Sequence, residues 1–444
     1  MHRVLIVAPS YVPSSYPPTH RVRFFARHLP EFGWQPEIVS VEAADMGEPA
    51  DPDIDRLAPQ SVPVTRSRAF PLRLTRRFGV GDLGYRSLLP MRRVLNEVIE
   101  RRRPDLVFIP GPPWPAFLHG PYIKRRFGIP YVIDYIDPWV NAIGADGRWW
   151  TKAFWFRQLA IKLEPDVVRH ASRFVAVSDG TNDDVRARYP WLPADRFTGI
   201  PYGFEASDFD ALRSQPRANP YRDANDGKLH LVYVGAMLPN GFETLRALFA
   251  GVLRLRDTAP AVFERLRLHF FGTTYDPNAT EGRVAPVARE MGLAEQVTEH
   301  PKRVPYLDAL NILCTADAIL ALGSSERHYT ASKIFPNILA RRPMLAVYHE
   351  ASTVCDIVRE AHAGELVTYS DDSRAEQHSE EIAAALVRVV TPGNYAPERV
   401  RWGHFEEYSA RNMTRRLATI FDEVVDDAGE QALAMAGPHM DSHG

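Results

Sequence analysis

The sequence predicts an α/β protein with two doubly wound, Rossmann-like domains that face each other across a cleft. Strand-like apolar runs alternate with amphipathic helical patterns from the first residue, which is typical of parallel strands joined by right-handed crossovers. The alternation breaks between residues 206 and 228 and then restarts. A chain of 444 residues is also longer than one hydrophobic core usually serves.

Residues 1–205 form the predicted N-terminal domain. Its expected helices place apolar side chains on one face, as Val22, Phe25 and Leu29 do in the first of them. The predicted strands are 4–7, 37–41, 62–66, 105–109, 131–136, 174–177 and 198–202. The predicted helices are 21–29, 92–102, 115–127, 149–170 and 181–188.

Residues 206–228 are polar and contain several prolines, which predicts a linker. Residues 229–406 form the predicted C-terminal domain. Its strands are 229–234, 266–271, 318–322 and 344–348, and its helices are 242–255, 284–291, 306–314, 354–363 and 382–390, with a further helix between the last two strands. Residues 407–426 form a last amphipathic helix with no strand after it, and residues 427–444 are expected to be a disordered tail.

Composition restricts the class of protein. A net charge of −2 argues against nucleic acid as the main partner. The two cysteines have no metal-ligand spacing and are expected to be buried free thiols in a reducing compartment. A strand follows directly after the first three residues, with no signal peptide, and no apolar run approaches the roughly 20 residues of a membrane span. A cytoplasmic protein is expected.

The stretch 324–350 carries the strongest local signal. It reads as a strand end closed by Gly323, then a loop, a helix and the next strand. Thr330 and Ser332 are the candidate N-caps, and Lys333 falls in the first turn, where a cation opposes the helix dipole. Free first-turn amides beside a lysine suit an anion such as phosphate. The alternative is an ordinary helix between two strands with a surface lysine.

Ligands of open parallel sheets bind beyond the carboxyl ends of the strands. Asp134 and Asp137 lie three residues apart at one such end, so they point to opposite faces and at most one can face a ligand. We predict Asp137, which is nearer the loop, although an Asp before Pro138 is also a common way to begin a turn. The loop 9–20 after the first strand has no Gly-x-Gly-x-x-Gly dinucleotide fingerprint, which argues against a dehydrogenase. The sequence also has no Gly-x-Ser-x-Gly serine elbow and no Gly-x-x-x-x-Gly-Lys-Ser/Thr phosphate loop.

Two stretches combine basic and aromatic residues. Eight arginines fall between residues 66 and 93, and the segment 148–162 holds Trp149, Trp150, Phe154, Trp155 and Phe156 beside four cations. Such a composition fits peripheral contact with an anionic membrane. The alternative is a solvated basic loop beside a well-packed aromatic helix.

Several motifs, in this order and spacing, resemble the retaining glycosyltransferases of family 4, which have the GT-B fold. The resemblance covers nearly the whole chain. The segments that carry it are 30–41, Leu163-Glu164 with 171–178, Ile200-Pro201-Tyr202-Gly203-Phe204 with Asp208-Phe209, Tyr233-Val234-Gly235, Phe270-Phe271-Gly272, Ser332-Lys333 and Pro343-Met344-Leu345-Ala346. The Ser332-Lys333 pair reads as a variant of the family's donor motif. The resemblance also implies that the last helix crosses back onto the first domain.

The sequence departs from the family at the donor site. The family's two glutamates would fall at His328 and Pro336, and its usual Arg and Lys after Gly235 are missing. By position, Arg303, Glu326 and Lys333 are substitutes. The full set of predicted donor-binding residues is Gly235, Gly272, Thr273, Arg303, Glu326, Ser332 and Lys333.

The resemblance implies transfer of a sugar from a nucleotide diphosphate sugar to a glycan, lipid-linked or small-molecule acceptor, with retention. Lys333 and Asp137 are the predicted catalytic residues, and Ser10, Tyr11 and His20 are predicted on the acceptor side. No metal or cofactor is expected, because the sequence shows no cluster of His and Cys residues with metal-ligand spacing. The missing glutamates leave open a non-catalytic binding or scaffold protein of the same fold, and a sugar-nucleotide epimerase is a third reading.

Overall fold

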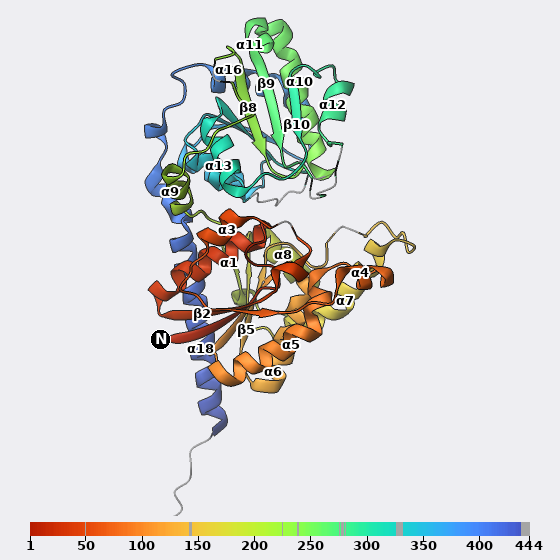
Figure 1. The fold of residues 1–444 in the computed structure, drawn as a ribbon, viewed down its shortest axis with the longest axis vertical. Coiled ribbons are helices and arrows are strands. Elements are labelled where there is room, and N and C mark those ends of the chain that lie inside the picture. The colour runs from red at the N-terminus through yellow and green to blue at the C-terminus, as the bar shows by residue number, and fades with distance from the viewer. Residues whose placement is uncertain are drawn as a thin grey trace, which may run out of the picture. The chain divides into compact units, whose positions relative to one another are not determined.

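The computed structural model describes residues 1–48, 50–141, 144–223, 225–237, 239–274, 276, 279, 281–325 and 332–436. Within these ranges the chain divides into two compact units (Figure 1). The first unit comprises residues 1–202 and the C-terminal segment from Ala410, and the second unit comprises residues 203–409. Each unit is built around one parallel sheet with helices on both faces.

The first unit contains a sheet whose described strands follow the order β3-β2-β1-β4-β5-β6-β7. These strands are β1 (His2–Val7), β2 (Trp34–Val41), β3 (Val64–Ser67), β4 (Leu106–Gly111), β5 (Tyr131–Tyr135), β6 (Arg173–Ala176) and β7 (Phe197–Gly199). The helices are α1 (Pro17–His28), α2 (Ala43–Met46), α3 (Pro52–Leu57), α4 (Leu72–Thr75), α5 (Leu83–Arg102), α6 (His119–Phe127), α7 (Lys152–His170), α8 (Asp179–Arg188) and α18 (Ala410–Ala436). Short 3-10 helices span Leu29–Phe32, Arg76–Phe78, Trp114–Leu118 and Ala194–Arg196.

The second unit repeats this plan with the strand order β10-β9-β8-β11-β12-β13. Its strands are β8 (Leu229–Val234), β9 (Leu266–Phe271), β10 (Val297–His300), β11 (Ala318–Leu322), β12 (Met344–His349) and β13 (Glu365–Tyr369). The helices are α9 (Ser207–Ser214), α10 (Phe242–Thr258), α11 (Pro260–Arg265), α12 (Ala285–Glu290), α13 (Tyr306–Thr315), α14 (Ile334–Leu339), α15 (Thr353–Ala361), α16 (Ser379–Val390) and α17 (Trp402–Phe405). Its 3-10 helices span Pro239–Gly241, Ala375–His378, Pro397–Arg399 and Glu406–Tyr408.

Both strand orders place a switch point inside the sheet. In the first unit the chain runs outward from β1 through β2 to β3 and then returns to the other side of β1 with β4. The second unit does the same with β8 and β11, which pair in parallel with Ala318 opposite Leu231. The loops that leave the carboxyl ends of two such neighbouring strands turn to opposite faces and leave a crevice, which is where ligands of this architecture bind.

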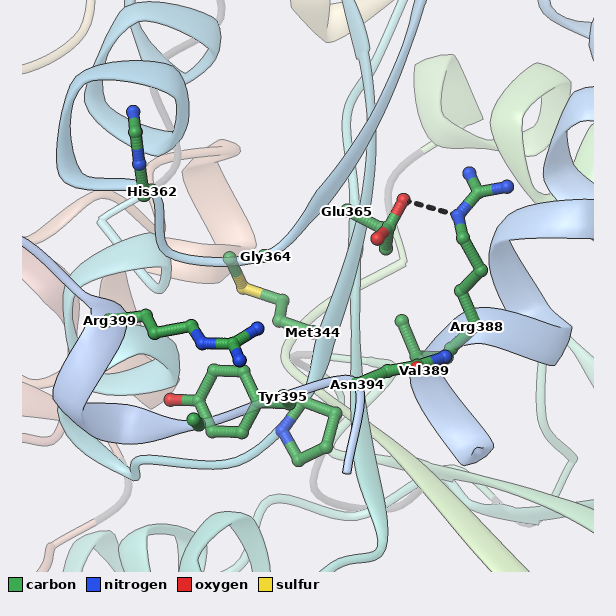
Figure 2. A pocket seen from close by; sticks show the side chains of 11 residues that line it. Met344, His362, Gly364, Glu365, Arg388, Val389, Asn394, Tyr395 and Arg399 are labelled. Carbon is green, nitrogen blue, oxygen red and sulfur yellow. Dashed lines mark hydrogen bonds and ion pairs between the residues drawn. The ribbon is translucent and has the colours of Figure 1, made fainter. Parts of the chain in front are cut away.

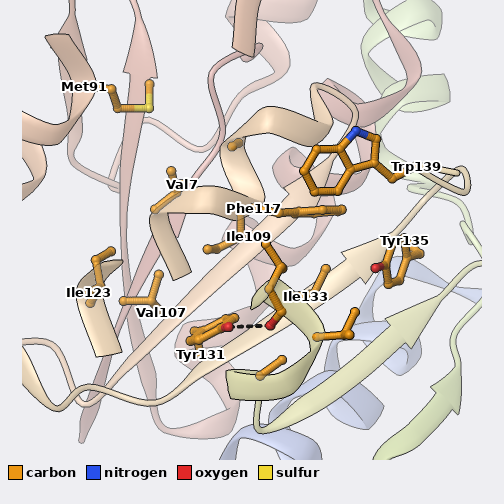
Figure 3. Close-up of a cluster of buried hydrophobic side chains, with 14 of the residues drawn as sticks. Val7, Met91, Val107, Ile109, Phe117, Ile123, Tyr131, Ile133, Tyr135 and Trp139 are labelled. Carbon is orange, nitrogen blue, oxygen red and sulfur yellow. Dashed lines mark hydrogen bonds between the residues drawn. The ribbon is translucent and has the colours of Figure 1, made fainter. Parts of the chain in front are cut away.

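The hydrophobic core of the first unit lies around the central strands of its sheet (Figure 3). The strands β4 and β5 are buried on both faces, so they read as continuous apolar runs without alternation. Val107, Ile109 and Ile133 face helices α5 to α7, and the Tyr131 hydroxyl donates to the Val167 carbonyl at 2.6 Å. That hydrogen bond lets a polar tip end inside the core.

The last helix packs onto the first unit, as the resemblance implied. Phe421 of α18 makes edge-to-face contacts with Trp34 and Phe108, and Trp34 Nε1 donates to Asp422 at 2.9 Å. The helix begins at Ala410 and continues to Ala436, so it starts later and ends later than the predicted 407–426. Residues 437–444 lie outside the described ranges.

Several predicted boundaries differ from the structure for local reasons. Helix α7 begins at Lys152, not at 149, because the Thr151 hydroxyl caps it by accepting from the Phe154 N–H at 3.2 Å. Helix α5 begins at Leu83, nine residues before the predicted start, after Asp82 caps it and with Pro90 inside it. The predicted linker contains helix α9, whose Phe209 and Leu212 are buried. Of the two free cysteines, Cys355 is buried and Cys314 only partly so.

Candidate functional site

The loops at the carboxyl ends of β8, β9 and β11 meet at the switch point of the second sheet. The Met237 N–H donates to the Thr273 carbonyl at 2.9 Å, which joins the β8 and β9 loops. The Ser325 N–H donates to the Asn240 carbonyl at 2.8 Å, which joins the β8 and β11 loops. These backbone contacts hold three strand ends together, and the residues that follow them form the candidate site.

Two glycines let the backbone turn at this edge. Gly235 has φ +145° and Gly272 has φ +67°, both in regions that L side chains rarely adopt. A Cβ at Gly235 would lie 3.3 Å from both Cδ and Nζ of Lys333, so the missing side chain leaves room for that lysine. The same addition at Gly272 would come 3.6 Å from Cα of Arg303. The glycines therefore bring both predicted cations close to the strand ends.

Lys333 is the N-cap of α14, and Ser332 is not, which corrects the prediction from sequence. The reason is Pro336, which has no N–H to donate to the Ser332 carbonyl four residues earlier. The first helical bond instead runs from the Asn337 N–H to the Lys333 carbonyl at 3.2 Å. No side chain among the described residues caps this helix, and Ser332 lies in the turn just before it. Thr330, the other candidate cap, lies outside the described residues.

The ammonium of Lys333 is desolvated and contacts an aromatic ring. Nζ lies 4.1 Å from the centroid of the Tyr233 ring and donates to the Tyr233 hydroxyl, which itself donates to the Ala236 carbonyl at 3.0 Å. Although part of the residue stays accessible, burial lowers the pKa of Lys333 from 10.5 to about 7. Among the described residues, no carboxylate forms an ion pair with Nζ. Such a group gains from an anionic ligand, which would restore its charge.

Thr273 supports the loop and does not present its hydroxyl to a ligand. It is fully buried, and its Oγ1 donates to the Glu299 carboxylate. Glu299 also accepts from the backbone N–H groups of Arg283, Val284 and Ala285 at 2.7 to 2.9 Å. The Glu299 carboxylate, on β10, therefore joins the start of α12 to the loop after β9. Sequence reasoning missed it, because a single glutamate in a short half-buried strand gives no local signal.

Arg283 is a second residue that the sequence analysis missed. Its guanidinium donates to the Met237 carbonyl at 3.3 Å, so it reaches the β8 loop and remains exposed. Arg303 is half-buried beside Gly272. The edge thus gathers Lys333, Arg283 and Arg303. The predicted donor-site residue Glu326 and the family position His328 lie outside the described residues.

In the first unit the two aspartates after β5 have different environments. Asp134 is fully buried and forms a bidentate pair with Arg21 at 2.6 and 3.0 Å. Burial raises its pKa, and Arg21 opposes that shift. Asp137 is exposed in the following loop, where the Trp114 indole donates to its backbone carbonyl at 2.8 Å. Asp134 is therefore a structural residue, and Asp137 is the one at the surface.

The three predicted acceptor-side residues also differ in accessibility. Tyr11 is 1% exposed, and burial raises its pKa to about 12, so it belongs to the interior. His20 is half-buried on α1, with Nδ1 3.3 Å from the Arg23 guanidinium. Ser10 is buried, and its hydroxyl donates to the carboxylate of Glu48, which also accepts from Ser14.

Glu48 is the functional candidate of the first unit that sequence reasoning missed. Burial raises its pKa above the ordinary value of 4.5, and the nearby charge of Asp82 adds to that shift. The hydroxyls of Ser10 and Ser14 act in the opposite direction by stabilising the ionised form. Glu48 follows α2 and is distant in sequence from the loop after β1, so the two come into contact only in the folded protein. The sequence separation of 38 residues hides this contact.

A pocket of ≈ 210 Å³ lies at the opposite edge of the second sheet (Figure 2). Met344 and Glu365, which line it, are the first residues of β12 and β13, and Glu365 pairs with Arg388 at 2.8 Å. Amino ends of parallel strands are not where this architecture binds ligands. None of the predicted site residues lines this pocket, and we assign it no substrate.

The described ranges contain neither a metal-binding cluster nor a membrane-spanning helix. No group of three or more His, Cys, Asp or Glu there is arranged to hold a metal ion. No helix in that part of the chain combines the length and the apolar character needed to cross a membrane.

Comparison with known proteins agrees with the geometry. Residues 18–203 match the family model described as a glycosyl transferase 4-like domain. That segment covers most of the first unit, including the loop with Asp137 and helix α7. A search of curated proteins found no match.

Solved structures match over nearly the whole chain. Anabaena HepE in complex with UDP and glucose has a TM-score of 0.60 at 14% identity, covering 95% of this chain and 100% of that one. A UDP-forming α,α-trehalose-phosphate synthase from Burkholderia vietnamiensis has a TM-score of 0.63 at 13% identity, covering 97% and 100%. A glycosyltransferase from Rickettsia africae has a TM-score of 0.58 at 14% identity, covering 96% and 99%. At these identities the likeness shows the fold, and the predicted GT-B fold is confirmed.

Proposed function

We propose that the protein transfers a sugar from a nucleotide diphosphate sugar to an acceptor hydroxyl, with retention and without a metal ion. In this reaction the bond from the anomeric carbon to the β-phosphate oxygen breaks and a bond to the acceptor oxygen forms. The acceptor's proton is released, and the nucleoside diphosphate leaves with the bonding electrons. Negative charge therefore develops on the β-phosphate.

The observation that carries the proposal is the environment of Lys333. Its ammonium lies at the switch point of the second sheet, is desolvated, and has no carboxylate partner among the described residues. A preorganised cation at the position where charge develops stabilises the transition state more than the ground state. Lys333 is thus assigned to the β-phosphate, and Arg303 with Arg283 to the remaining phosphate charge.

The other predicted residues receive roles by position. The backbone at Gly235 and Gly272 admits the donor close to the strand ends, and Ser332 lies in the turn before Lys333. Asp137, in the first unit, is assigned to the sugar or the acceptor, and Glu326 to sugar or ribose hydroxyls. On the acceptor side half-buried His20 lines the loop, whereas Ser10 and Tyr11 are buried and support it.

The neighbours support a nucleotide-sugar donor, because structures of HepE hold UDP with glucose or UDP-glucose. The family model over residues 18–203 supports glycosyl transfer. The proposal places the protein in the cytoplasm, where its donor would be available. The hexosyl character of the donor and the identity of the acceptor belong to the same proposal.

The test begins with a thermal-shift panel of UDP, GDP, ADP, CDP and TDP, each beside its nucleoside and monophosphate. We expect one diphosphate to raise Tm well above its own nucleoside. The matching sugar nucleotides are then assayed for release of diphosphate. Binding without any release would favour a non-catalytic scaffold, and no shift with any diphosphate would contradict the donor site itself.

A further inference from the structure

Exposed hydrophobic side chains gather in two segments of the first unit. Eleven large hydrophobic side chains are exposed among the described residues, and nine of them fall within residues 70–89 and 149–161. Phe78, Trp149, Trp150 and Trp155 are the most exposed of these, at 61 to 80%. The second unit contributes none among its described residues. Such a concentration marks an interaction surface, whereas scattered exposed residues would not.

The fold brings these two segments together. The rings of Tyr85 and Phe156 lie 5.8 Å apart, and α4 lies beside the start of α7 (Figure 1). Between them is a mainly apolar depression of ≈ 280 Å³, whose walls include Phe70, Phe78, Phe156 and Leu159. The aromatic residues of α7 are therefore not simply a packed helix face, which was the alternative considered from the sequence.

The same two segments are rich in cations, although buried Arg86, and Arg68 with its partner Asp45, add little charge to the surface. Eight arginines and one carboxylate, Asp82, occur in residues 66–93, and four cations and one carboxylate, Asp146, occur in residues 144–162. The Asp82 side chain caps α5, and Asp146 pairs with Arg148. Arg73, Arg76, Arg77 and Lys152 are exposed and form no ion pair within the described ranges. Their charge is thus available to an anionic partner.

We propose that the surface formed by residues 70–78 and 148–162 docks on an anionic lipid bilayer. The unpaired cations complement anionic headgroups, and tryptophan is favoured at the boundary between headgroups and acyl chains. The exposed tryptophans project from the surface in edge-to-face contact with a neighbouring ring, with 6.0 Å between the ring centroids of Trp149 and Trp150 and 5.5 Å between those of Phe154 and Trp155. A fluid bilayer can receive such projecting groups without matched pockets, whereas a protein partner would need a concavity for each. The proposal is independent of the donor site.

The experiment uses the full chain and vesicles of two compositions. Vesicles of pure phosphatidylcholine are compared with vesicles holding 30% phosphatidylglycerol, each at low and high salt, in a flotation assay. We expect binding only to the anionic vesicles and loss of that binding at high salt. Tryptophan emission should shift to shorter wavelength on binding, as Trp149 and Trp150 leave water.

Variants separate the two contributions. The double variant Arg76→Ala/Arg77→Ala should bind anionic vesicles about thirtyfold more weakly, as expected for two lost charges near the surface. Trp149→Phe/Trp150→Phe should remove most of the emission shift. The matched controls Arg415→Ala and Trp191→Phe replace an exposed unpaired cation and an exposed tryptophan outside this surface and should change neither readout.

Three outcomes of the vesicle-binding assay, and one of the control variants, would contradict the proposal. Binding that is equal for the two vesicle types, or that persists at high salt, would contradict it, as would an absence of binding. So would control variants that weaken binding as much as the double variants. Thermal unfolding of every variant, measured alongside, confirms that a loss of binding does not reflect a loss of fold.

Discussion

Arg21 and Lys333 are both cations held inside the fold near the carboxyl edge of a sheet, and they differ in what neutralises them. Arg21 of the first unit has a bidentate carboxylate partner in Asp134 and also donates to the Pro201 carbonyl at 3.0 Å. Lys333 of the second unit has only the hydroxyl and ring of Tyr233 among the described residues. A completed pair is a structural element, and an incomplete one is available to a ligand.

Structural and functional charges respond differently when one group is removed. Removing one partner of a buried pair leaves an uncompensated charge, so the completed pair can be probed by stability. A desolvated lysine without a carboxylate partner already carries that penalty, so its removal should not destabilise the fold.

The variant Arg21→Ala should lower the free energy of unfolding by about 3–5 kcal/mol, because it leaves Asp134 charged and buried. Urea denaturation measures the loss. The double variant Arg21→Met/Asp134→Leu should recover most of it, and Arg68→Ala, which breaks the exposed pair with Asp45, should lose less than about 1 kcal/mol. A loss below 1 kcal/mol for Arg21→Ala would contradict the structural role.

Stability should depend on pH through Lys333. Its pKa is about 7 in the folded protein and 10.5 when unfolded, so the unfolded chain binds more protons between these values. The free energy of unfolding should therefore rise with pH in this window, by up to about 1.4 kcal/mol for each unit. Lys333→Met lacks this contribution. Urea titrations of both proteins from pH 7 to 9.5 test it, and parallel curves would show that the lysine is not desolvated.

The variant Gly235→Ala should lose roughly 1–2 kcal/mol of stability, because alanine at φ +145° is strained. Its Cβ would also press on Lys333, so diphosphate affinity should fall as well. The matched control is Gly33→Ala. Gly33 also has a positive φ, but a Cβ added there has no neighbouring atom within 4 Å, so this variant tests backbone strain alone. Equal diphosphate affinity in Gly235→Ala and wild type would mean that this glycine does not shape the site.

The smallest expected effect is that of metal removal. If Lys333 and the nearby arginines neutralise the diphosphate, sugar transfer should be unchanged within about twofold by excess EDTA. The control is addition of magnesium or manganese to the treated enzyme. If EDTA abolished activity and either ion restored it, a metal ion and not Lys333 would be the main group that neutralises the diphosphate.

The sequence predicted the parts of the molecule that depend on local periodicity. Strands such as 105–109 and 266–271 and the alternation of strand and helix gave both domains, because buried parallel strands read as apolar runs. Short half-buried elements were missed, among them β10 and α11, where only Val297 of β10 is fully buried and no apolar face repeats. Helix α5 was placed too late, at 92, where Pro90 interrupts its pattern.

The candidate site was predictable only where a residue lies in the segment between the carboxyl end of a strand and the next helix. Lys333, Gly235, Gly272 and Asp137 could be found in this way. The contacts of Glu48 and Glu299, and the pairing of Arg21 with Asp134 across 113 residues, depend on the tertiary fold. The capping error at Ser332 has a different cause. Pro336 has no N–H to donate to the Ser332 carbonyl, so Lys333 becomes the N-cap of α14.

The most direct test of the account is a calorimetric titration of wild type and Lys333→Met with the nucleoside diphosphate selected by the thermal-shift panel. We predict that the variant binds it more weakly by about 1.5–3 kcal/mol, the usual contribution of a hydrogen bond to a charged group. Binding of the matching nucleoside should stay the same, and the variant should unfold at an equal or higher temperature. Equal diphosphate affinity in the two proteins would contradict the assignment of Lys333 to the β-phosphate.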